Sequence, residues 1–284
     1  MKIPRIVAYV QSGDADPTQN HYIPLVNKTG QTNKSLIKLN NKPMIQYVLE
    51  AIDGCPYISD IVISGIQPKD IEPYSPSKNC HYIQSGKTAF ESTIIGINFV
   101  NSFENPPDYM CNIPSDLPLI STQVINKVFE SIDWSKNFEI YQNWVREETI
   151  RLHYPKATKK IQKFKNGHFA GGDFYIYHPS ILTPKRLKIT EALMNNRKNF
   201  VMGAKVIGLG IFIKIILKIL SIEDILRRFK KLGVRGSIYI TDFPETCVDL
   251  DYVEDIDIFE EYCQSPNRDI TNDQPIIFIS TDDV

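Results

Sequence analysis

The sequence predicts an α/β fold, a single domain in which a mixed, mainly parallel sheet is flanked by helices and carries a helical insertion. Short apolar runs rich in β-branched and aromatic residues alternate with helical patterns through the first half of the chain. This alternation is typical of parallel strands joined by crossover helices. A length of 284 residues without repeats or a low-complexity linker favours one elaborated domain over two.

The first half supplies most of the expected elements. Pro43 suits the first turn of a helix, and Ser121 is a natural cap for another. The expected strands are 5–10, 60–65, 80–84 and 109–113, and the expected helices are 42–53, 89–103 and 121–132.

The alternation weakens after about residue 138. We expect strands at 138–145, 159–167, 168–177, 236–241 and 245–251, and a helix at 253–263. A helical block at about 185–231 would be an insertion into a domain spanning 1–263. Residues 264–284 form a polar tail with one short apolar run, for which the sequence gives no role.

The composition excludes several classes of protein. Lys and Arg number 32 against 33 Asp and Glu, so no net field favours nucleic acid or an anionic membrane. The five cysteines lack metal-site spacing, which indicates free thiols in a reducing compartment. The N-terminal apolar run is too short for a signal peptide, so we expect a cytoplasmic protein.

Asp116 lies in the stretch "NIPSDLPLIS", between an expected strand and an expected helix. Aspartate is a poor strand former and Pro118 ends a strand, so Asp116 should follow the carboxyl end of its strand. Ligands bind parallel sheets at that edge. Asp116 is therefore a candidate ligand-binding residue, with helix capping as the alternative. Asp249 and Asp251 alternate with apolar residues, which suits a half-exposed strand without a ligand as well as a functional role.

A long loop follows the first strand and contains Gly13, Gly30 and Lys34. Glycine permits close backbone approach to a ligand, and an exposed loop lysine could meet phosphate as a point charge. The P-loop pattern is absent, so phosphate binding and an ordinary surface loop both stay open.

Four stretches together resemble one family. "KSLIKLNNKPMIQYVLEAI", Asp116-Leu117-Pro118, "FAGGDFYIYHPSIL" and "VDLDYVEDI" (248–256) occur in the order found in nucleotidyltransferases of the glycosyltransferase-A-like, Rossmann-like fold. The molybdenum-cofactor guanylyltransferase-like (MobA-like) group is the most similar. The chain differs in reading "VQSG" in the first loop, in having Asp173 where the group has asparagine, and in having Val253 in place of a proline.

The resemblance implies a role for each matching residue. Mg²⁺ or Mn²⁺ would be the cofactor, and an NTP and a phosphorylated small molecule the substrates, with pyrophosphate released. It implies catalytic Lys34, Asp116 and Asp249; metal ligands Asp116 and Asp249; nucleotide-binding Gln11, Ser12, Gly13, Lys34 and Gly86; and substrate-binding Gly171, Gly172, Asp173 and Asp251.

Two other functions stay open on the same residues. One is sugar-nucleotide synthesis or glycosyl transfer on this fold. The other is a nucleotide-binding regulatory protein without turnover, which the altered first loop would suit.

Two remaining stretches lie outside the motifs that carry the resemblance. Residues 156–165 read as a solvated basic face, with a substrate phosphate site as the alternative. Residues 203–220 approach the length of a membrane span, but three lysines offset their apolar residues. We expect this segment to pack within the protein or a homodimer interface, with peripheral membrane contact as the alternative.

Overall fold

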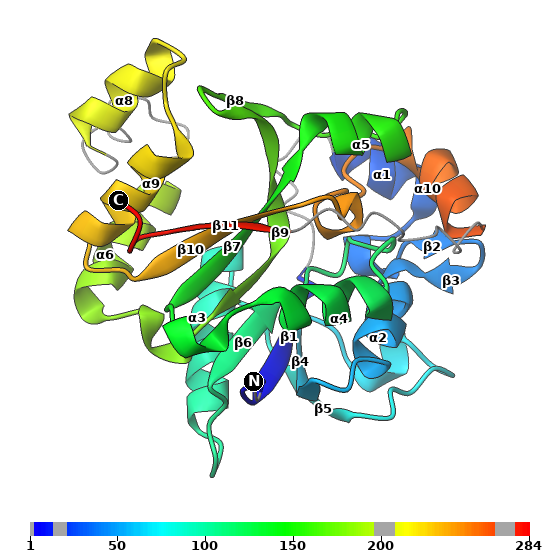
Figure 1. Cartoon of the computed structure of the whole chain (residues 1–284). Coiled ribbons are helices and arrows are strands. Elements are labelled where there is room, and N and C mark those ends of the chain that lie inside the picture. Colours follow the sequence, from blue (N-terminus) through cyan, green and yellow to red (C-terminus); the bar gives the residue numbers. More distant parts are fainter. Residues whose placement is uncertain (1–2, 14–21, 196–207, 265–275) are drawn as a thin grey trace.

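A nine-stranded sheet forms the centre of the protein, as the computed structural model in Figure 1 shows. The structure describes residues 3–13, 22–195, 208–264 and 276–284. The strand order is β11-β10-β7-β9-β6-β1-β4-β5, with β8 pairing to β9. The strands are β1 (Ile6–Gln11), β4 (Ile58–Ser64), β5 (Asn79–Ile83), β6 (Tyr109–Asn112), β7 (Ile140–Arg146), β8 (Gln162–Phe164), β9 (Gly167–Tyr177), β10 (Gly236–Thr241) and β11 (Ile277–Ser280).

The sheet is mixed and mainly parallel, which confirms the expected fold class. β5, β4, β1 and β6 are parallel neighbours, and β7 and β10 form a second parallel pair. β9 lies antiparallel between β6 and β7, and β11 is antiparallel to β10. β11 brings residues 277–280 of the C-terminal segment into the sheet.

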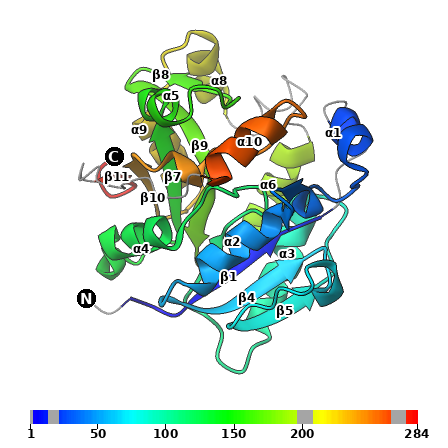
Figure 2. The ribbon, with the colours of Figure 1, turned by 90° about the vertical axis from the view of Figure 1, so that its right-hand side faces the viewer.

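Helices cover both faces of the sheet (Figure 2). α2 (Met44–Asp53) and α4 (Thr122–Ser131) pack on one face against Ala8 and Val10 of β1. α3 (Ala89–Asn101) packs on the other face against Val7 and Tyr9. This alternation along β1 follows from the period of two in a strand, with both faces buried as in parallel sheets. Ser121 caps α4, as expected, by accepting a hydrogen bond from Val124 N–H.

A second core lies beneath the elements that follow the carboxyl ends of the strands. Its members include Leu39, Val145, Leu250 and Phe259, all fully buried. The elements around it are α1 (Tyr22–Thr29), the short β2 (Lys38–Leu39) and β3 (Lys42–Pro43), α5 (Glu147–His153) and α10 (Asp255–Gln264).

Three local predictions are wrong. The segment after β1, expected to be one long loop, contains α1, and α5 follows β7 where no helix was expected. Residues 245–251 are not a strand: a short 3₁₀ helix (Pro244–Thr246) leads into an irregular segment. Val248 and Leu250 are buried as the alternation indicated, but Leu250 N–H bonds to the Asp116 carbonyl instead of to a strand.

The helical block is confirmed by α6 (Pro184–Asn195), α8 (Leu209–Ile216) and α9 (Ile222–Lys231). Residues 203–207 of the segment 203–220 lie outside the described residues. Five large aliphatic side chains of the described part are exposed, so most of this segment does not pack within the protein, whereas the homodimer interface stays a prediction. Within the described ranges, every helix is too short or too polar to cross a bilayer.

Candidate active site

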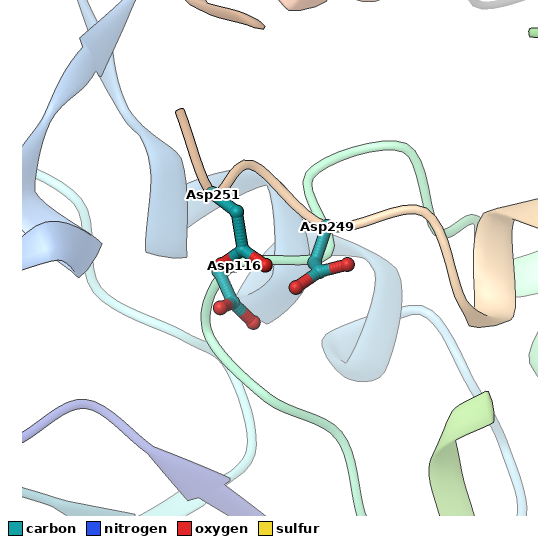
Figure 3. A group of neighbouring side chains, drawn as sticks. All are labelled: Asp116, Asp249 and Asp251. Carbon is teal, nitrogen blue, oxygen red and sulfur yellow. The ribbon is translucent and has the colours of Figure 1, made fainter. Parts of the chain in front are cut away.

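Three carboxylates converge beyond the carboxyl ends of the strands (Figure 3). Asp116 comes from the loop after β6, and Asp249 and Asp251 come from the segment before α10. One oxygen of each lies within 4.8 Å of one oxygen of both others. The two loops are joined by Leu250 N–H, which donates to the Asp116 carbonyl at 3.2 Å. The structure thus brings Asp116 and Asp249 to one place, as the sequence predicted.

Lys34 lies between two of these carboxylates. Its Nζ is 2.8 Å from Asp116 Oδ2 and 2.8 Å from Asp251 Oδ1. Asn33 caps the 3₁₀ helix Lys34–Leu36 and donates to the Ser12 carbonyl, so the lysine is fixed to the first loop. The expectation of an exposed loop lysine is wrong, because the Lys34 side chain is only 8% exposed.

Lys159 forms a second bridge, which sequence reasoning missed. Its Nζ is 2.6 Å from Asp249 Oδ1 and 3.1 Å from Asp173 Oδ2. With a side chain 12% exposed, Lys159 does not belong to a solvated basic face. Nothing local in "KATKKIQKFK" separates it from its neighbours, since its partners lie on β9 and beyond β10.

The electrostatics of this bridge are those of a partly buried ion network. Burial alone would lower the pKa of Lys159, but the Asp249 and Asp173 carboxylates raise it well above its ordinary value. Burial raises the pKa of Asp173, and the nearby Asp249 and Asp116 carboxylates raise it further against the opposing effect of Lys159. Lys159 therefore carries its charge at neutral pH, and Asp173 resists ionisation.

A bulge in β9 aims Asp173 at the site. The register with β7 shifts between Gln142 and Trp144, so that extra β9 residues face Asn143. A Cβ at Gly172 would lie 2.5 Å from the Asn143 side chain, which explains the glycine. Gly172 thus has a steric role here, whereas a Cβ at Gly171 would meet only Gln162 Nε2 at 4.0 Å. Contact of either glycine with a substrate stays a prediction.

The residues expected to bind nucleotide gather beside the start of α3. Gln11 Nε2 donates to Thr93 Oγ1 at 2.7 Å, and Gly86 N–H donates to Ser92 Oγ at 2.9 Å. Ser12 and Gly13 lie against Gly65, where a Cβ would be 2.6 Å from the Ser12 carbonyl oxygen. Gly65 has a φ of +95°, and the sequence gave no sign of its role. Residues 14–21 of this loop lie outside the described residues.

The donor set suits a hard divalent cation. Four carboxyl groups share two lysines among the residues described above, so the site keeps a negative charge. Mg²⁺ typically uses one or two protein carboxylates together with substrate phosphates. Asp116 and Asp249 fit this requirement, with Asp251 as a third oxygen donor in reach.

Comparison with known proteins places the chain. Residues 27–198 match the family described as the MobA-like NTP transferase domain. The chain belongs to this family. The match contains Lys34, Asp116, Lys159 and Asp173, whereas Asp249 and Asp251 lie beyond it.

Individual relatives of this NTP transferase domain agree with the assignment. A 2-C-methyl-D-erythritol 4-phosphate cytidylyltransferase from Lachnoclostridium phytofermentans is 27% identical over 111 residues, which cover 37% of this chain and 46% of the relative. The match therefore spans about half of that relative's length.

Two solved structures share the fold. A hypothetical transferase from Thermus thermophilus has a TM-score of 0.72 at 22% identity, covering 89% of this chain and 99% of its own. A 4-diphosphocytidyl-2C-methyl-D-erythritol synthase from Anaerococcus prevotii has a TM-score of 0.52 at 10% identity, covering 92% and 96%.

Proposed function

We propose that the protein transfers a nucleoside monophosphate from an NTP to a phosphorylated small molecule. A phosphate oxygen of the acceptor attacks the α-phosphorus of the NTP and forms a new P–O bond. The bond between the α-phosphorus and the β-bridging oxygen breaks, and pyrophosphate leaves with both electrons of that bond. The observation that carries this proposal is the convergence of Asp116 and Asp249 with Lys34 in a chain of the NTP transferase family.

Asp116 and Asp249 would hold Mg²⁺ or Mn²⁺. The bound cation supplies charge neutralisation at the α-phosphate as the transition state forms. Lys34 would turn from Asp116 and Asp251 toward the phosphates and orient the leaving pyrophosphate. Gln11, Ser12, Gly13 and Gly86 would contact the nucleotide. The first loop lies near Lys34, since the preceding Asn33 donates to the Ser12 carbonyl.

Lys159 and Asp173 would act on the acceptor side. Lys159 fixes the Asp249 carboxylate at 2.6 Å and presents a charged ammonium to any phosphate that enters beside it. Gly171, Gly172 and Asp251 flank this position and are proposed to contact the acceptor. A phosphorylated acceptor suits such a cation.

CTP is the nucleotide to test first. The relative from Lachnoclostridium phytofermentans is a cytidylyltransferase, and the Anaerococcus prevotii synthase forms a diphosphocytidyl product by its name. The other three NTPs serve as comparisons in the same assay.

One observation favours a regulatory nucleotide-binding protein as the second candidate. Lys34 and Lys159 each bridge two carboxylates, so both must break ion pairs before they meet phosphate. A site held closed in this way could bind nucleotide without turning it over.

A pyrophosphate-release screen separates the two functions. Purified protein with Mg²⁺, each NTP and a set of phosphorylated sugars, alcohols and polyols should release pyrophosphate with one acceptor. Release should stop when EDTA removes the divalent cation. Tight NTP binding by calorimetry without release for any acceptor would favour the regulatory function.

A further inference from the structure

Exposed aliphatic side chains are concentrated at the end of α8. Of the ten large apolar residues exposed among the described residues, five lie within seven positions: Ile213, Ile215, Ile216, Leu217 and Ile219. We call these five the α8 patch. Their exposed fractions range from 43% to 59%, whereas the other five exposed residues are scattered over the chain. Single exposed aliphatics are ordinary, but a contiguous group indicates a contact surface.

Buried neighbours on either side of the patch fix its position on the protein. Ile211 and Leu220 pack at either side of it into the core beneath α9, together with Ile222 and Leu226. Lys214 pairs with Asp224 near the start of α9. α8 therefore keeps its position against the domain, at the outer edge of the molecule above α9 (Figure 1). The side chains of the patch remain exposed.

Basic side chains border the patch. Lys218 is exposed between Leu217 and Ile219, and Lys163 and Lys165 are exposed on the β8–β9 hairpin. That hairpin is joined to Leu220, the residue that follows the patch, by Lys165 N–H, which donates to the Leu220 carbonyl at 2.8 Å. The acidic Asp224 is neutralised by both Lys214 and Arg227.

Charged residues are also distributed unevenly along the whole chain. Residues 156–235 hold 18 of the 32 Lys and Arg but only 4 of the 33 Asp and Glu. This third of the chain thus carries a net +14, and the remainder carries −15. The near-neutral total conceals a strongly basic region, in which the α8 patch lies.

We propose that the α8 patch docks onto an anionic lipid surface. An apolar face with lysines at its border is the composition of an interfacial segment, which buries its aliphatics at the headgroup boundary. Juxtaposed lysines and arginines add attraction to anionic lipid. The eight residues of α8 are too short to span a bilayer, so the contact is peripheral.

Other occupants fit the surface less well. Nucleic acid would bind the basic border but would gain little from five aliphatic side chains, since its bases stack on aromatic rings and arginine. A second copy of the chain would bring the same basic region against itself, because a two-fold interface pairs identical patches. An anionic membrane matches both the charge and the apolar surface.

Vesicle flotation of the full chain tests the proposal. The vesicles are phosphatidylcholine alone and phosphatidylcholine with phosphatidylglycerol, each at low and high salt. We expect at least about tenfold stronger binding to the anionic vesicles, weakened by salt. Ile216→Asp/Leu217→Asp should lower this binding by about tenfold or more, and Lys163→Glu/Lys218→Glu should lower it less.

The matched control is Ile95→Asp/Leu152→Asp, which makes the same exchange at two exposed aliphatics outside the patch. It should bind vesicles like the wild type, and circular dichroism should show all variants folded. The proposal fails if the wild type does not bind anionic vesicles, or if patch and control variants lose binding equally. Binding lost only in the lysine variant would identify a general polyanion site instead. A concentration-dependent dimer that Ile216→Asp/Leu217→Asp disperses, without vesicle binding, would make the patch a subunit interface.

Discussion

Two clusters of charged side chains lie at opposite ends of the central strands. At the amino end, the Asp60 carboxylate is bonded by Arg5 Nη2 at 3.0 Å and Asn79 Nδ2 at 3.1 Å, with His81 Nε2 at 3.5 Å. Burial opposes ionisation of Asp60, but hydrogen bonds from Ser59 and these partners lower its pKa to about 2.

At the carboxyl end the balance is reversed. Asp116, Asp173, Asp249 and Asp251 share two lysines, and the pKa of Asp173 is raised instead of lowered. One cluster has more donors than carboxylates and is complete in itself. The other has more carboxylates than cations and can accept a further positive charge. The comparison indicates that a surplus of carboxylates over cations, and not ion pairing as such, distinguishes the proposed metal site from a structural ion pair.

The largest expected effect is on the rate of pyrophosphate release, at the carboxyl end of the strands, where carboxylates outnumber cations. Asp249→Asn should lower pyrophosphate release by about 10²–10³, because it removes charge that acts in the transition state. The fold should persist, since asparagine keeps the size of the side chain. Asp257→Asn, an exposed carboxylate of α10, is the control and should retain full activity. Equal activity of both variants would remove Asp249 from the site.

A smaller effect, on stability, is expected when the surplus of carboxylates over cations is increased. Lys159→Met leaves Asp173 and Asp249 without their cation, and we expect the free energy of unfolding at pH 7 to fall by about 2 kcal/mol. Urea unfolding measures it. Lys160→Met, an exposed neighbour, should be neutral. Adding Asp173→Asn to Lys159→Met should recover part of the loss, and a double variant as unstable as the single would contradict the ion network.

The cluster around Asp60 predicts a pH dependence of the free energy of unfolding. The folded pKa of Asp60 lies near 2 and the unfolded value near 4, so the ionised group stabilises the fold above about pH 4. That contribution, about 1–2 kcal/mol, is lost as the pH falls toward 2. Wild type and Asp60→Asn should therefore differ in unfolding free energy at pH 7 and converge near pH 2. A constant difference across this window would show that Asp60 acts by packing alone.

Lys34→Ala should give a change in nucleotide affinity. Loss of one charge-assisted phosphate contact weakens binding by about tenfold. Calorimetry with Mg²⁺ and CTP measures it. Lys38→Ala, an exposed lysine of β2, is the matched control. Unchanged affinity in Lys34→Ala would leave the lysine as a structural partner of Asp116 and Asp251.

The sequence predicted what local periodicity and short motifs encode. The apolar runs of β1, β4 and β6 alternate along the chain with the amphipathic patterns of α2 and α4, and this order predicted the sheet class. Asp116 was predicted to follow a strand end because aspartate is a poor strand former and Pro118 ends a strand. Its pairing with Asp249 came from the resemblance to the family, since the strand expected at 245–251 is not formed.

The misses have a common physical cause. Lys159 is identical in type to Lys156 and Lys160, and only the return of β9 beside β7 brings carboxylates to it. Residues 245–251 have a strand's alternation, but the partner of Leu250 is a carbonyl of the Asp116 loop. The outward position of the α8 patch depends on which neighbours anchor it. Partners that lie far apart in the sequence cannot be predicted from a local pattern.

The central claim is that Asp116 acts by its negative charge, and one measurement tests it most directly. Asp116→Asn keeps the size and hydrogen-bonding capacity of the side chain but removes that charge. With the acceptor found for the wild type, at saturating Mg²⁺ and NTP, we predict that turnover falls by about 10²–10³ while NTP affinity changes far less. Pyrophosphate release within a few-fold of the wild-type rate would contradict the account.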